Sequence, residues 1–414
     1  MSKAELRAVC EHIREIMPKV EQPARGHLAR PFLTPSFGKF YPETVYCWDH
    51  FHMGLRFARD GRPEYMRYLV ENLLHHQGPN GLTPNSVSAA HGPSRMWPPF
   101  HAQPFLMQSA FLYARATGDT AWAREVLPKL LLTLRYYEER WRAPFGLFRW
   151  PLAYMSGFDN DVVTTFHQPD TIISADVNAW LYLEYLAGAK LAALVKDRAQ
   201  ERALRNRARA LAKAVNDVLW DEEAGSYAAY DLCAGRRKFS LGDAFVADVG
   251  KFAFQTCSNL IPLYARMAPP ARAKRMIEGY VLNAEHFLSP WGIRSLSRSS
   301  EYYNNAVWGN PPRFGPHDRM TNSNWQGPVW VPLGYFMCHA LRHYGFRREA
   351  AEVADRTVRV LAKSLREVGS FAENFDGETG APLYCRNFAS WNLLADTMHE
   401  DLKRGEQPLD AVFA

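Results

Sequence analysis

The sequence lacks the features that mark membrane, secreted and disulfide-built proteins. It contains no stretch of ~18 uninterrupted apolar residues, so we expect no membrane-spanning segment. The charged, amphipathic N-terminus has no apolar region of the kind found in secretory signals. Only six cysteines occur in 414 residues, and none forms a CxxC pair, which argues against a disulfide scaffold and a zinc knuckle. We therefore expect a cytoplasmic protein with reduced thiols.

Basic runs and metal-binding patterns are scarce as well. Lys and Arg total 49 against 43 Asp and Glu, a net charge of +6, and the basic residues are scattered, which disfavours a nucleic-acid partner. His50, His52, His75, His76 and His101 form no HExxH or His-plus-acid spacing. The sequence therefore predicts no catalytic metal and no cofactor.

Helical periodicity, by contrast, is abundant. Apolar residues make up 47% of the chain and charged residues 22%, values typical of a globular protein. The helices come in pairs joined by short pivots that carry Gly, Asp or Pro. The first helix of each pair is apolar nearly all round and the second has one charged face, which indicates a buried helix followed by a surface helix.

This pairing predicts the fold class. Five inner helices are expected at 48–58, 103–117, 176–195, 256–267 and 328–344, and each is followed by an outer helix. A charged helix at 3–17 and an apolar helix at about 388–403 complete six outer and six inner helices. Such a set predicts an all-α (α/α)6 barrel, with an open array of helix pairs as the alternative. No linker or composition break interrupts the chain, so we expect one domain over residues 1–414.

The connections between the helices differ in length. Each connection from an inner to an outer helix is a short pivot. The connections from outer to inner helices are long and cover about 78–102, 142–175, 220–255, 284–327 and 367–387. The long loops must therefore share one end of the barrel, and loops of this kind on a rigid scaffold usually carry function.

These loops concentrate acids, amides and aromatic residues. They hold YCWDHFH at 46–52, WPPFHAQPF at 97–105, YMSGFDND at 154–161, NWQGPVW at 324–330 and SFAENFDGETG at 370–380. Aromatic faces can stack on a sugar ring while carboxylates and amides bind its hydroxyls. Two opposed carboxyl groups can cleave a glycosidic bond as acid and base, and apolar surroundings raise the pKa of the acid. The pattern favours sugar chemistry.

The motifs SGFDN, NWQGPVW and AENFDGETG, with WDHFH and PPFHAQPF, resemble those of glycoside hydrolase family 63 and, more distantly, of the trehalases. The resemblance runs from about Tyr41 to about Trp391. It implies an (α/α)6 barrel and an inverting α-glycosidase, with Asp159 as the general acid and Glu373 as the general base. The chain has no room for the β-sandwich of larger members, so it is similar to the short bacterial mannosylglycerate and glucosylglycerate hydrolases.

Some residues of this chain differ from the family pattern, and the acids of the SGFDN motif have alternative interpretations. Many family members carry an aromatic residue and an Arg where this chain has Asn324 and Gln326, which bears on the substrate more than on the chemistry. Asp159 could instead form a turn, and Asp161 is expected to be a solvated neighbour.

The proposed base has competitors within its own loop. Asp376 is typical of a turn residue and Glu378 of a flanking surface acid. Glu373 lies between Phe371 and Phe375, which argues for a sheltered acid and favours it as the base.

Substrate binding is predicted for residues around the acids. Asp49 could simply cap the first inner helix, and Gln103 could be an ordinary residue of a helix N-terminus. Trp325 and Trp330 suit the core as well as a stacking platform. The full predicted binding set is Tyr46, Trp48, Asp49, Gln103, Gly157, Asn160, Trp325, Gln326 and Trp330.

The predicted activity is inverting hydrolysis of a small α-glucoside or α-mannoside. Candidate substrates are glucosylglycerate, mannosylglycerate and a short α-glucoside such as trehalose. An anionic glycerate would need an arginine, and Arg236, Arg237, Arg313 and Arg386 lie in the long loops. Room for a water predicts carboxyl groups ~6.5–9.5 Å apart. A sugar epimerase with paired histidines and a helical-repeat interaction protein are the alternatives.

Overall fold

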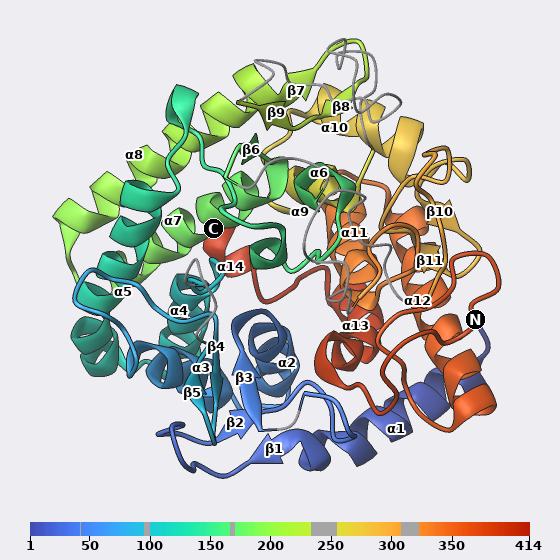
Figure 1. Cartoon of the computed structure of the whole chain (residues 1–414), viewed down its shortest axis with the longest axis horizontal. Coiled ribbons are helices and arrows are strands. Elements are labelled where there is room, and N and C mark those ends of the chain that lie inside the picture. Colours follow the sequence, from blue (N-terminus) through green and yellow to red (C-terminus); the bar gives the residue numbers. More distant parts are fainter. Residues whose placement is uncertain (42, 95–99, 166–169, 233–254, 308–322) are drawn as a thin grey trace.

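A computed structural model describes residues 1–41, 43–94, 100–165, 170–232, 255–307 and 323–414. In this part of the chain, helices alternate between an inner and an outer ring, seen end-on in Figure 1. The inner helices are α2 (Cys47–Arg59), α4 (Leu106–Thr117), α7 (Ala175–Leu194), α9 (Ile261–Tyr264), α11 (Val331–His343) and α13 (Thr397–Arg404). The outer helices are α1 (Lys3–Val20), α3 (Glu64–Leu74), α5 (Thr120–Arg140), α8 (Arg198–Ala214), α10 (Pro270–Met276) and α12 (Arg347–Val368).

The ring is closed, as the (α/α)6 prediction requires. The last inner segment, a 3-10 helix at Ser390–Asp396 that leads into α13, packs against α2, and α1 packs against α12. These contacts join the two ends of the helical series. The open-array alternative is therefore wrong.

Burial explains which helices lie inside. α7 is buried along most of its length, including the polar residues Asp176, Asn178 and Glu184. α12 instead buries one stripe that includes Ala350 and Val358, and its opposite face carries charge. A helix buried all round belongs to the inner layer and a striped helix to the outer layer.

Two inner helices are less regular than the sequence predicts. The helix expected at 256–267 is a 3-10 turn, Cys257–Leu260, followed by α9. The Thr256 hydroxyl accepts from the Ser258 backbone N–H and starts the turn, and Pro262 lies in the first turn of α9, where its missing N–H costs nothing. The second inner helix begins at Leu106 rather than Gln103, because Pro104 disfavours a helical residue before it.

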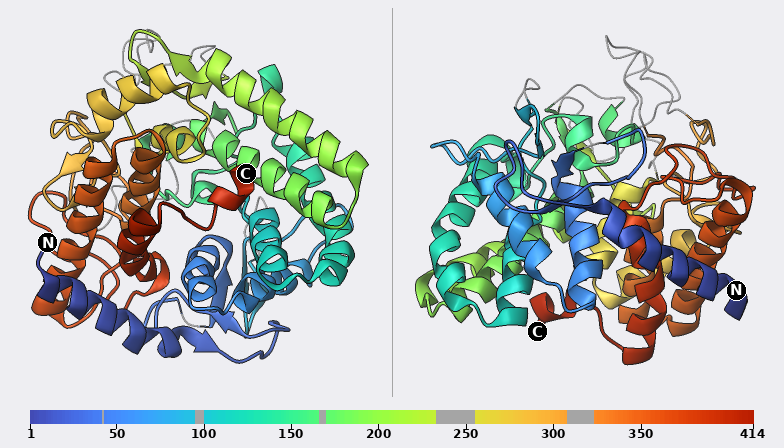
Figure 2. Two further views of the ribbon diagram at one scale, coloured as in Figure 1. Left: turned by 180° about the vertical axis from the view of Figure 1, so that it is seen from behind. Right: turned by 90° about the horizontal axis from the view of Figure 1, so that it is seen from below.

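Small antiparallel sheets order the loops. β3 (Thr44–Tyr46), β4 (Ser86–Ser88) and β5 (Gly92–Pro93) form a three-stranded sheet. The two-stranded pairs are β1 (Glu21–Gln22) with β2 (Phe32–Leu33), β6 (Ile172–Ile173) with β9 (Tyr230–Asp231), β7 (Trp220–Asp221) with β8 (Ser226–Tyr227), and β10 (Leu288–Ser289) with β11 (Gly292–Ile293). In the right view of Figure 2, the loops lie at the upper end and the C-terminus at the lower end.

Two short helices were not predicted. α6 (Val162–Thr165) follows the SGFDN motif, and α14 (Asp410–Phe413) ends the chain. The left view of Figure 2 shows α14 within the ring, and the right view shows the C-terminus at the end opposite the long loops. Asp410 forms ion pairs with Arg342 and Arg266, which hold the C-terminal segment there.

The hydrophobic interior runs through the whole ring. One cluster of buried residues extends from Val9 in α1 to Val412 in α14. The expectation of one domain over residues 1–414 stays a prediction that this continuous core favours. Among the described residues, no helix combines the length and the apolar character needed to cross a membrane.

Candidate active site

A pocket of about 300 Å³ lies among the long loops. Its wall is formed by Tyr41, Tyr46, Trp48, Asp49, Asn85, Ser86, Ser94, Phe100, Gln103, Gly157, Asp159, Ser323, Trp325, Trp330, Glu373, Phe388 and Trp391. The wall combines three carboxyl groups with hydroxyls, amides and aromatic rings. Within the described residues it contains no Lys, Arg or His. This composition suits a neutral, hydroxyl-rich ligand.

The SGFDN motif forms a tight turn that presents Asp159 to the pocket. Gly157 has φ +83°, a left-handed conformation that favours glycine. A Cβ there would lie 3.0 Å from Gln103 Nε2 and 3.3 Å from the Trp48 ring. Phe158 is fully buried and packs against Trp325. The glycine thus allows the turn to lie directly against two other residues of the pocket wall.

An amide network behind the wall joins this turn to the NWQGPVW segment. Asn160 Oδ1 accepts from the Trp325 backbone N–H over 2.5 Å. Gln326 Nε2 donates to the Asn160 carbonyl over 3.0 Å, and Asn160 Nδ2 donates to Asn324 Oδ1 over 3.3 Å. Asn160 and Gln326 were predicted to bind substrate, but they lie behind the wall and hold two loops together.

Asp161 is not the solvated residue that the sequence suggested. It is buried, and its carboxylate accepts from the hydroxyls of Ser258 and Thr256 and from the Val163 backbone N–H. Burial raises its pKa to about 6. Ser258 and Thr256 precede α9, so Asp161 ties the acid-bearing turn to the next inner helix.

Glu373 is held by its own loop and by a neighbouring strand-like segment. Its backbone N–H donates to the Tyr384 and Cys385 carbonyls. Two residues later, Phe375 and Val329 exchange backbone hydrogen bonds, which pin the loop beside the start of α11. Glu373 is 2% exposed, in agreement with the shelter predicted from its two phenylalanine neighbours.

Asp159 and Glu373 both interact with Ser323. Ser323 Oγ donates to Glu373 Oε1 over 2.9 Å, and the same side chain favours the ionised form of Asp159. Both carboxyl groups line the same pocket. The hydroxyl of Tyr41 lies 3.3 and 3.4 Å from the two carboxylate oxygens of Glu373.

The acids titrate far from their ordinary range. Burial raises the pKa of Asp159 to about 7, and the nearby Asp49 carboxyl acts in the same direction. Burial raises the pKa of Glu373 as well, while hydrogen bonds from Ser323 and Tyr41 favour its ionised form. At neutral pH, such a pair can hold one proton and one negative charge.

Asp49 is a third acid in the same wall. Ser390 Oγ donates to Asp49 Oδ1 over 2.6 Å, and burial raises the Asp49 pKa to about 7. Tyr46, and not Asp49, occupies the N-cap position of α2. The helix-cap alternative considered from the sequence is therefore wrong, and the carboxyl group lies in the pocket wall.

Aromatic rings form the floor of the pocket. Trp325 and Trp330 stack with ring centroids 3.8 Å apart and planes 9° apart. Trp48 packs edge-on against several rings, including those of Phe105 and Trp180. All three tryptophans are buried and also line the pocket, so each belongs both to the core and to the pocket wall. For this reason the sequence could not distinguish a core role from a stacking role for Trp325 and Trp330.

Four polar atoms of wall residues have no partner in the described part of the chain. The donors Trp48 Nε1 and Trp391 Nε1 and the acceptors Gln103 Oε1 and Asn85 Oδ1 are buried without a hydrogen bond. Buried polar groups are nearly always satisfied in native proteins, so two donors and two acceptors are left for a ligand.

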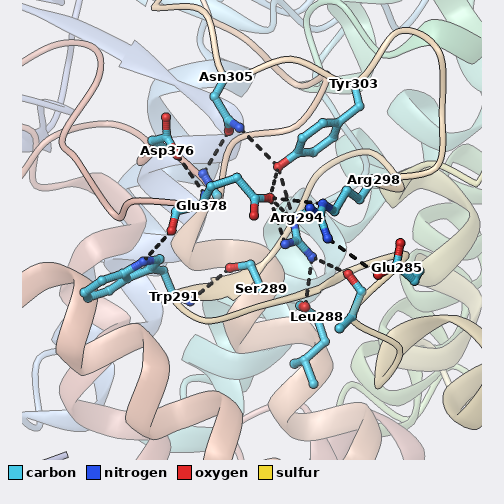
Figure 3. Close-up of polar contacts among 12 residues, drawn as sticks. Glu285, Leu288, Ser289, Trp291, Arg294, Arg298, Tyr303, Asn305, Asp376 and Glu378 are labelled. Atoms are coloured by element: carbon cyan, nitrogen blue, oxygen red, sulfur yellow. Dashed lines mark hydrogen bonds and ion pairs between the residues drawn. The ribbon is translucent and has the colours of Figure 1, made fainter.

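A buried arginine, Arg294, binds Glu378, which lies in the same loop as Glu373 (Figure 3). Arg294, 2% exposed, donates to Glu378 Oε1 from Nε over 3.1 Å and from Nη2 over 2.8 Å. The Tyr303 hydroxyl donates to the same oxygen over 2.6 Å. Asp376 accepts from the backbone N–H groups of Glu378 and Thr379, which confirms the predicted turn. Glu378 is exposed as predicted, but it is also the counter-charge of a buried cation.

The histidines mostly serve the scaffold. His50 Nε2 bonds to the Tyr65 carbonyl, His52 Nδ1 bonds to the Trp48 carbonyl, and His101 Nδ1 accepts from the Thr83 backbone N–H. None of the three belongs to the described wall of the pocket. Paired histidines for an epimerase are therefore missing from that wall. No group of three or more potential metal ligands occurs among the described residues.

Nine of the eleven predicted site residues line the pocket together: Tyr46, Trp48, Asp49, Gln103, Gly157, Asp159, Trp325, Trp330 and Glu373. Of the arginines proposed for an anionic ligand, Arg386 is exposed, and Arg236, Arg237 and Arg313 lie outside the described residues. Sequence reasoning missed Tyr41, Ser323, Ser390 and Trp391. These flank the recognised motifs, and no local pattern separates them from ordinary loop residues.

Known proteins resemble this chain in sequence and in fold. A sequence model of the mannosylglycerate hydrolase MGH1-like glycoside hydrolase domain matches residues 41–391. The mannosylglycerate hydrolase of Rubrobacter radiotolerans is 31% identical over 201 residues, which are 47% of this chain and 37% of that protein. The chain thus matches well under half of that relative's length.

The fold is similar to two groups of solved structures. The GH63 mannosylglycerate hydrolase from Thermus thermophilus, in complex with glucose, gives a TM-score of 0.71 at 19% identity over 93% of this chain and 98% of that one. The neutral trehalase from Saccharomyces cerevisiae gives a TM-score of 0.62 at 15% identity over 91% of this chain and 76% of that one. These likenesses show the barrel fold.

Proposed function

The chain belongs to the mannosylglycerate hydrolase MGH1-like family of glycoside hydrolases, and from this premise we propose that it is an inverting α-glycosidase with Asp159 as acid and Glu373 as base. The observation that carries the proposal is that these two carboxyl groups line one pocket together with several aromatic residues. They come from separate loops, and both have raised pKa values.

The two acids have different tasks in the proposed reaction. Protonated Asp159 gives its proton to the glycosidic oxygen, and the bond from that oxygen to the anomeric carbon breaks. Glu373 takes a proton from a water that attacks the anomeric carbon from the opposite face. The products are a free alcohol and a β-configured sugar, and Glu373 returns its proton to solvent while Asp159 is reprotonated. A pKa of about 7 suits Asp159 to donate near neutral pH.

The sugar ring is proposed to bind against the tryptophans. Trp325 and Trp330 offer a stacked apolar surface, and Asp49 offers a carboxyl group for sugar hydroxyls. The unpartnered Trp48 Nε1 and Gln103 Oε1 offer one donor and one acceptor. This is the mixture of apolar faces and fixed polar groups that a pyranose requires.

The proposed substrates remain small α-glycosides: glucosylglycerate, mannosylglycerate or a short α-glucoside such as trehalose. A volume of about 300 Å³ suits a disaccharide-sized ligand at most. The described wall has no cation, which favours a neutral leaving group. The mannosylglycerate hydrolase from Thermus thermophilus has been solved in complex with Tris and D-glycerate. Glycosylated glycerates stay among the proposed substrates. A cytoplasmic location likewise stays a prediction from the sequence.

One experiment tests reaction and substrate together. The protein is incubated with glucosylglycerate, mannosylglycerate, trehalose and glucosylglycerol, the last being a neutral analogue of the first. Hydrolysis is followed by proton NMR before the product anomers equilibrate. We expect β-glucose or β-mannose as the first product. Early α-product would refute the water-activating role of Glu373 and would make it a nucleophile.

A further inference from the structure

We infer that Asn160 is a positioning residue that ties the general acid to the stacked tryptophans, an inference that rests on the proposed function. Asn160 directly follows Asp159 in the chain and is 3% exposed, behind the pocket wall. Its side chain and its backbone both bond to the segment that carries Trp325. Asn160 thereby sets where the acid lies relative to a sugar that stacks on the tryptophans.

Both neighbours of the acid contact the same tryptophan. On one side, the Phe158 ring packs against the Trp325 ring, with the ring centroids 4.8 Å apart. On the other side, Asn160 Oδ1 accepts from the Trp325 backbone N–H over 2.5 Å. Trp325 in turn stacks on Trp330, and both line the pocket. The backbone that carries Asp159 is therefore anchored to the stacked tryptophans on both sides.

The orientation of the Asn160 amide is fixed by its partners. A backbone N–H can only donate, so the atom that faces Trp325 must be the amide oxygen. The amide nitrogen then donates to Asn324 Oδ1 over 3.3 Å, and the same Asn324 oxygen accepts from the Gln326 backbone N–H over 2.9 Å. Gln326 Nε2 adds a third bond, to the Asn160 carbonyl, over 3.0 Å. Three hydrogen bonds to one buried residue restrain the turn that presents the acid.

Proton donation depends on this restraint. The acid must reach the glycosidic oxygen, while the sugar ring is held against the tryptophans. Both conditions are met together only if the acid and the tryptophans keep a fixed separation. A misplacement of about 1 Å can cost ~10²-fold in rate. A substrate whose leaving group departs without a proton does not depend on the position of the acid.

The test compares two substrates of one sugar in wild type and Asn160→Ala. Glucosylglycerol needs a proton on its leaving oxygen, whereas α-glucosyl fluoride does not; the α-mannosyl pair replaces them if the enzyme prefers mannosides. Asn160→Ala should lower kcat/KM for glucosylglycerol by about 10- to 100-fold more than for the fluoride. A role in stability alone would lower both values equally, because it changes only the amount of folded enzyme.

Asn304→Ala is the matched control. Asn304 belongs to the same amide network, since its Oδ1 accepts from Asn324 Nδ2 over 2.8 Å and its Nδ2 donates to Gln326 Oε1 over 3.2 Å. Within the described residues, its hydrogen bonds do not reach the turn that carries Asp159. The control should lower the Tm as Asn160→Ala does, while it keeps the wild-type ratio between the two substrates.

A double-mutant cycle with the acid adds a second readout. In an Asp159→Asn background no acid remains to be positioned. Asn160→Ala should then cause no further loss on glucosylglycerol relative to the fluoride. Two independent effects would multiply instead.

The outcomes separate this inference from the proposed function. An equal loss on both substrates in a folded Asn160→Ala, or multiplied effects in the cycle, would overturn the inference. If Asn160→Ala does not fold, Gln326→Met carries the test, because it removes the bond to the Asn160 carbonyl at similar volume and should lower the same ratio by a smaller factor. A wild-type ratio in Asp159→Asn would instead remove the proposed function. A lowered ratio in Asp159→Asn with a wild-type ratio in Asn160→Ala would remove only the inference.

Discussion

Replacing Asp159 by Asn should abolish proton donation and, at the same time, stabilise the fold at neutral and alkaline pH. The side chain keeps its shape, and the amide that replaces the carboxyl group does not titrate. Loss of a general acid lowers kcat by ~10²–10⁴-fold. KM should change little, because the proton is transferred only in the transition state.

The stability change follows from the raised pKa. The folded pKa of about 7 exceeds the ordinary value of 3.8, so the folded chain binds more protons between these pH values. The free energy of unfolding of the wild type must therefore fall as the pH rises through this range. One pKa unit corresponds to ~1.36 kcal/mol, so ionisation of Asp159 in the folded protein lowers the free energy of unfolding by at most ~4 kcal/mol. Because Asp159 is only partly buried and the pocket admits water, we expect ~1–2 kcal/mol.

Asn carries no charge, so the variant avoids this cost. For 414 residues, an unfolding entropy of ~2.1 cal/mol/K per residue converts ~1–2 kcal/mol into a Tm gain of ~1–2 °C at pH 8. The gain should shrink at pH 5, where wild-type Asp159 stays protonated in the folded protein. Asp217→Asn, which removes an exposed acid of the outer layer, should show full activity and no such pH-dependent offset.

The assay combines thermal unfolding with two substrates. A glycosyl fluoride has a leaving group that departs without a proton, so Asp159→Asn should hydrolyse it at close to the wild-type rate while failing on an alkyl glycoside. Near-full activity on the alkyl glycoside would refute the acid role. A Tm offset of equal size at pH 5 and pH 8 would refute the account of an acid whose pKa is raised in the folded protein.

Three further substitutions test the remaining parts of the site. Glu373→Gln should lower kcat by ~10²–10⁴-fold on both substrate types, because water activation is needed whatever the leaving group; activity on the fluoride alone would contradict this. Gly157→Ala should lower stability by ~1–2 kcal/mol through its left-handed backbone and raise KM by crowding the pocket, as thermal unfolding and steady-state kinetics would report. Glu378→Gln should leave buried Arg294 without its counter-charge and lower stability by ~1–3 kcal/mol, whereas Glu285→Gln, at a 74% exposed side chain, should have little effect in the same unfolding assay.

The barrel could be predicted because its signal is local and repeated. The stripe of α12 and the uniformly apolar character of α7 each distinguish an outer from an inner helix without any knowledge of their neighbours. The fourth inner helix was predicted less well, since Thr256 caps a 3-10 turn and Asp161, almost a hundred residues earlier, bonds to it. That contact has no trace in the local sequence. Helix ends fixed by distant partners lie beyond what periodicity can predict.

The site residues also fall into those that local sequence predicts and those that it does not. Asp159 and Glu373 stand in motifs whose composition already indicates acids among aromatic residues. Ser323 and Tyr41 have no such setting, because their place follows from how the loops meet. Asn160 illustrates the reverse error: a polar residue inside a motif need not face the ligand, and here its amide instead connects two loops.

Hydrogen bonds at the loop end of the barrel connect the segments that carry the two acids. The Asp159 turn is bonded to the segment before α11 through Asn160, and that segment is bonded to the Glu373 loop through Val329 and Phe375. Every link joins loops that belong to different helix pairs. The helices thus provide the packed core, whereas loop-to-loop hydrogen bonds connect the segments on which the two carboxyl groups lie. A family with this architecture can change its substrate by altering the loops while the helices, and the stability they provide, stay as they are.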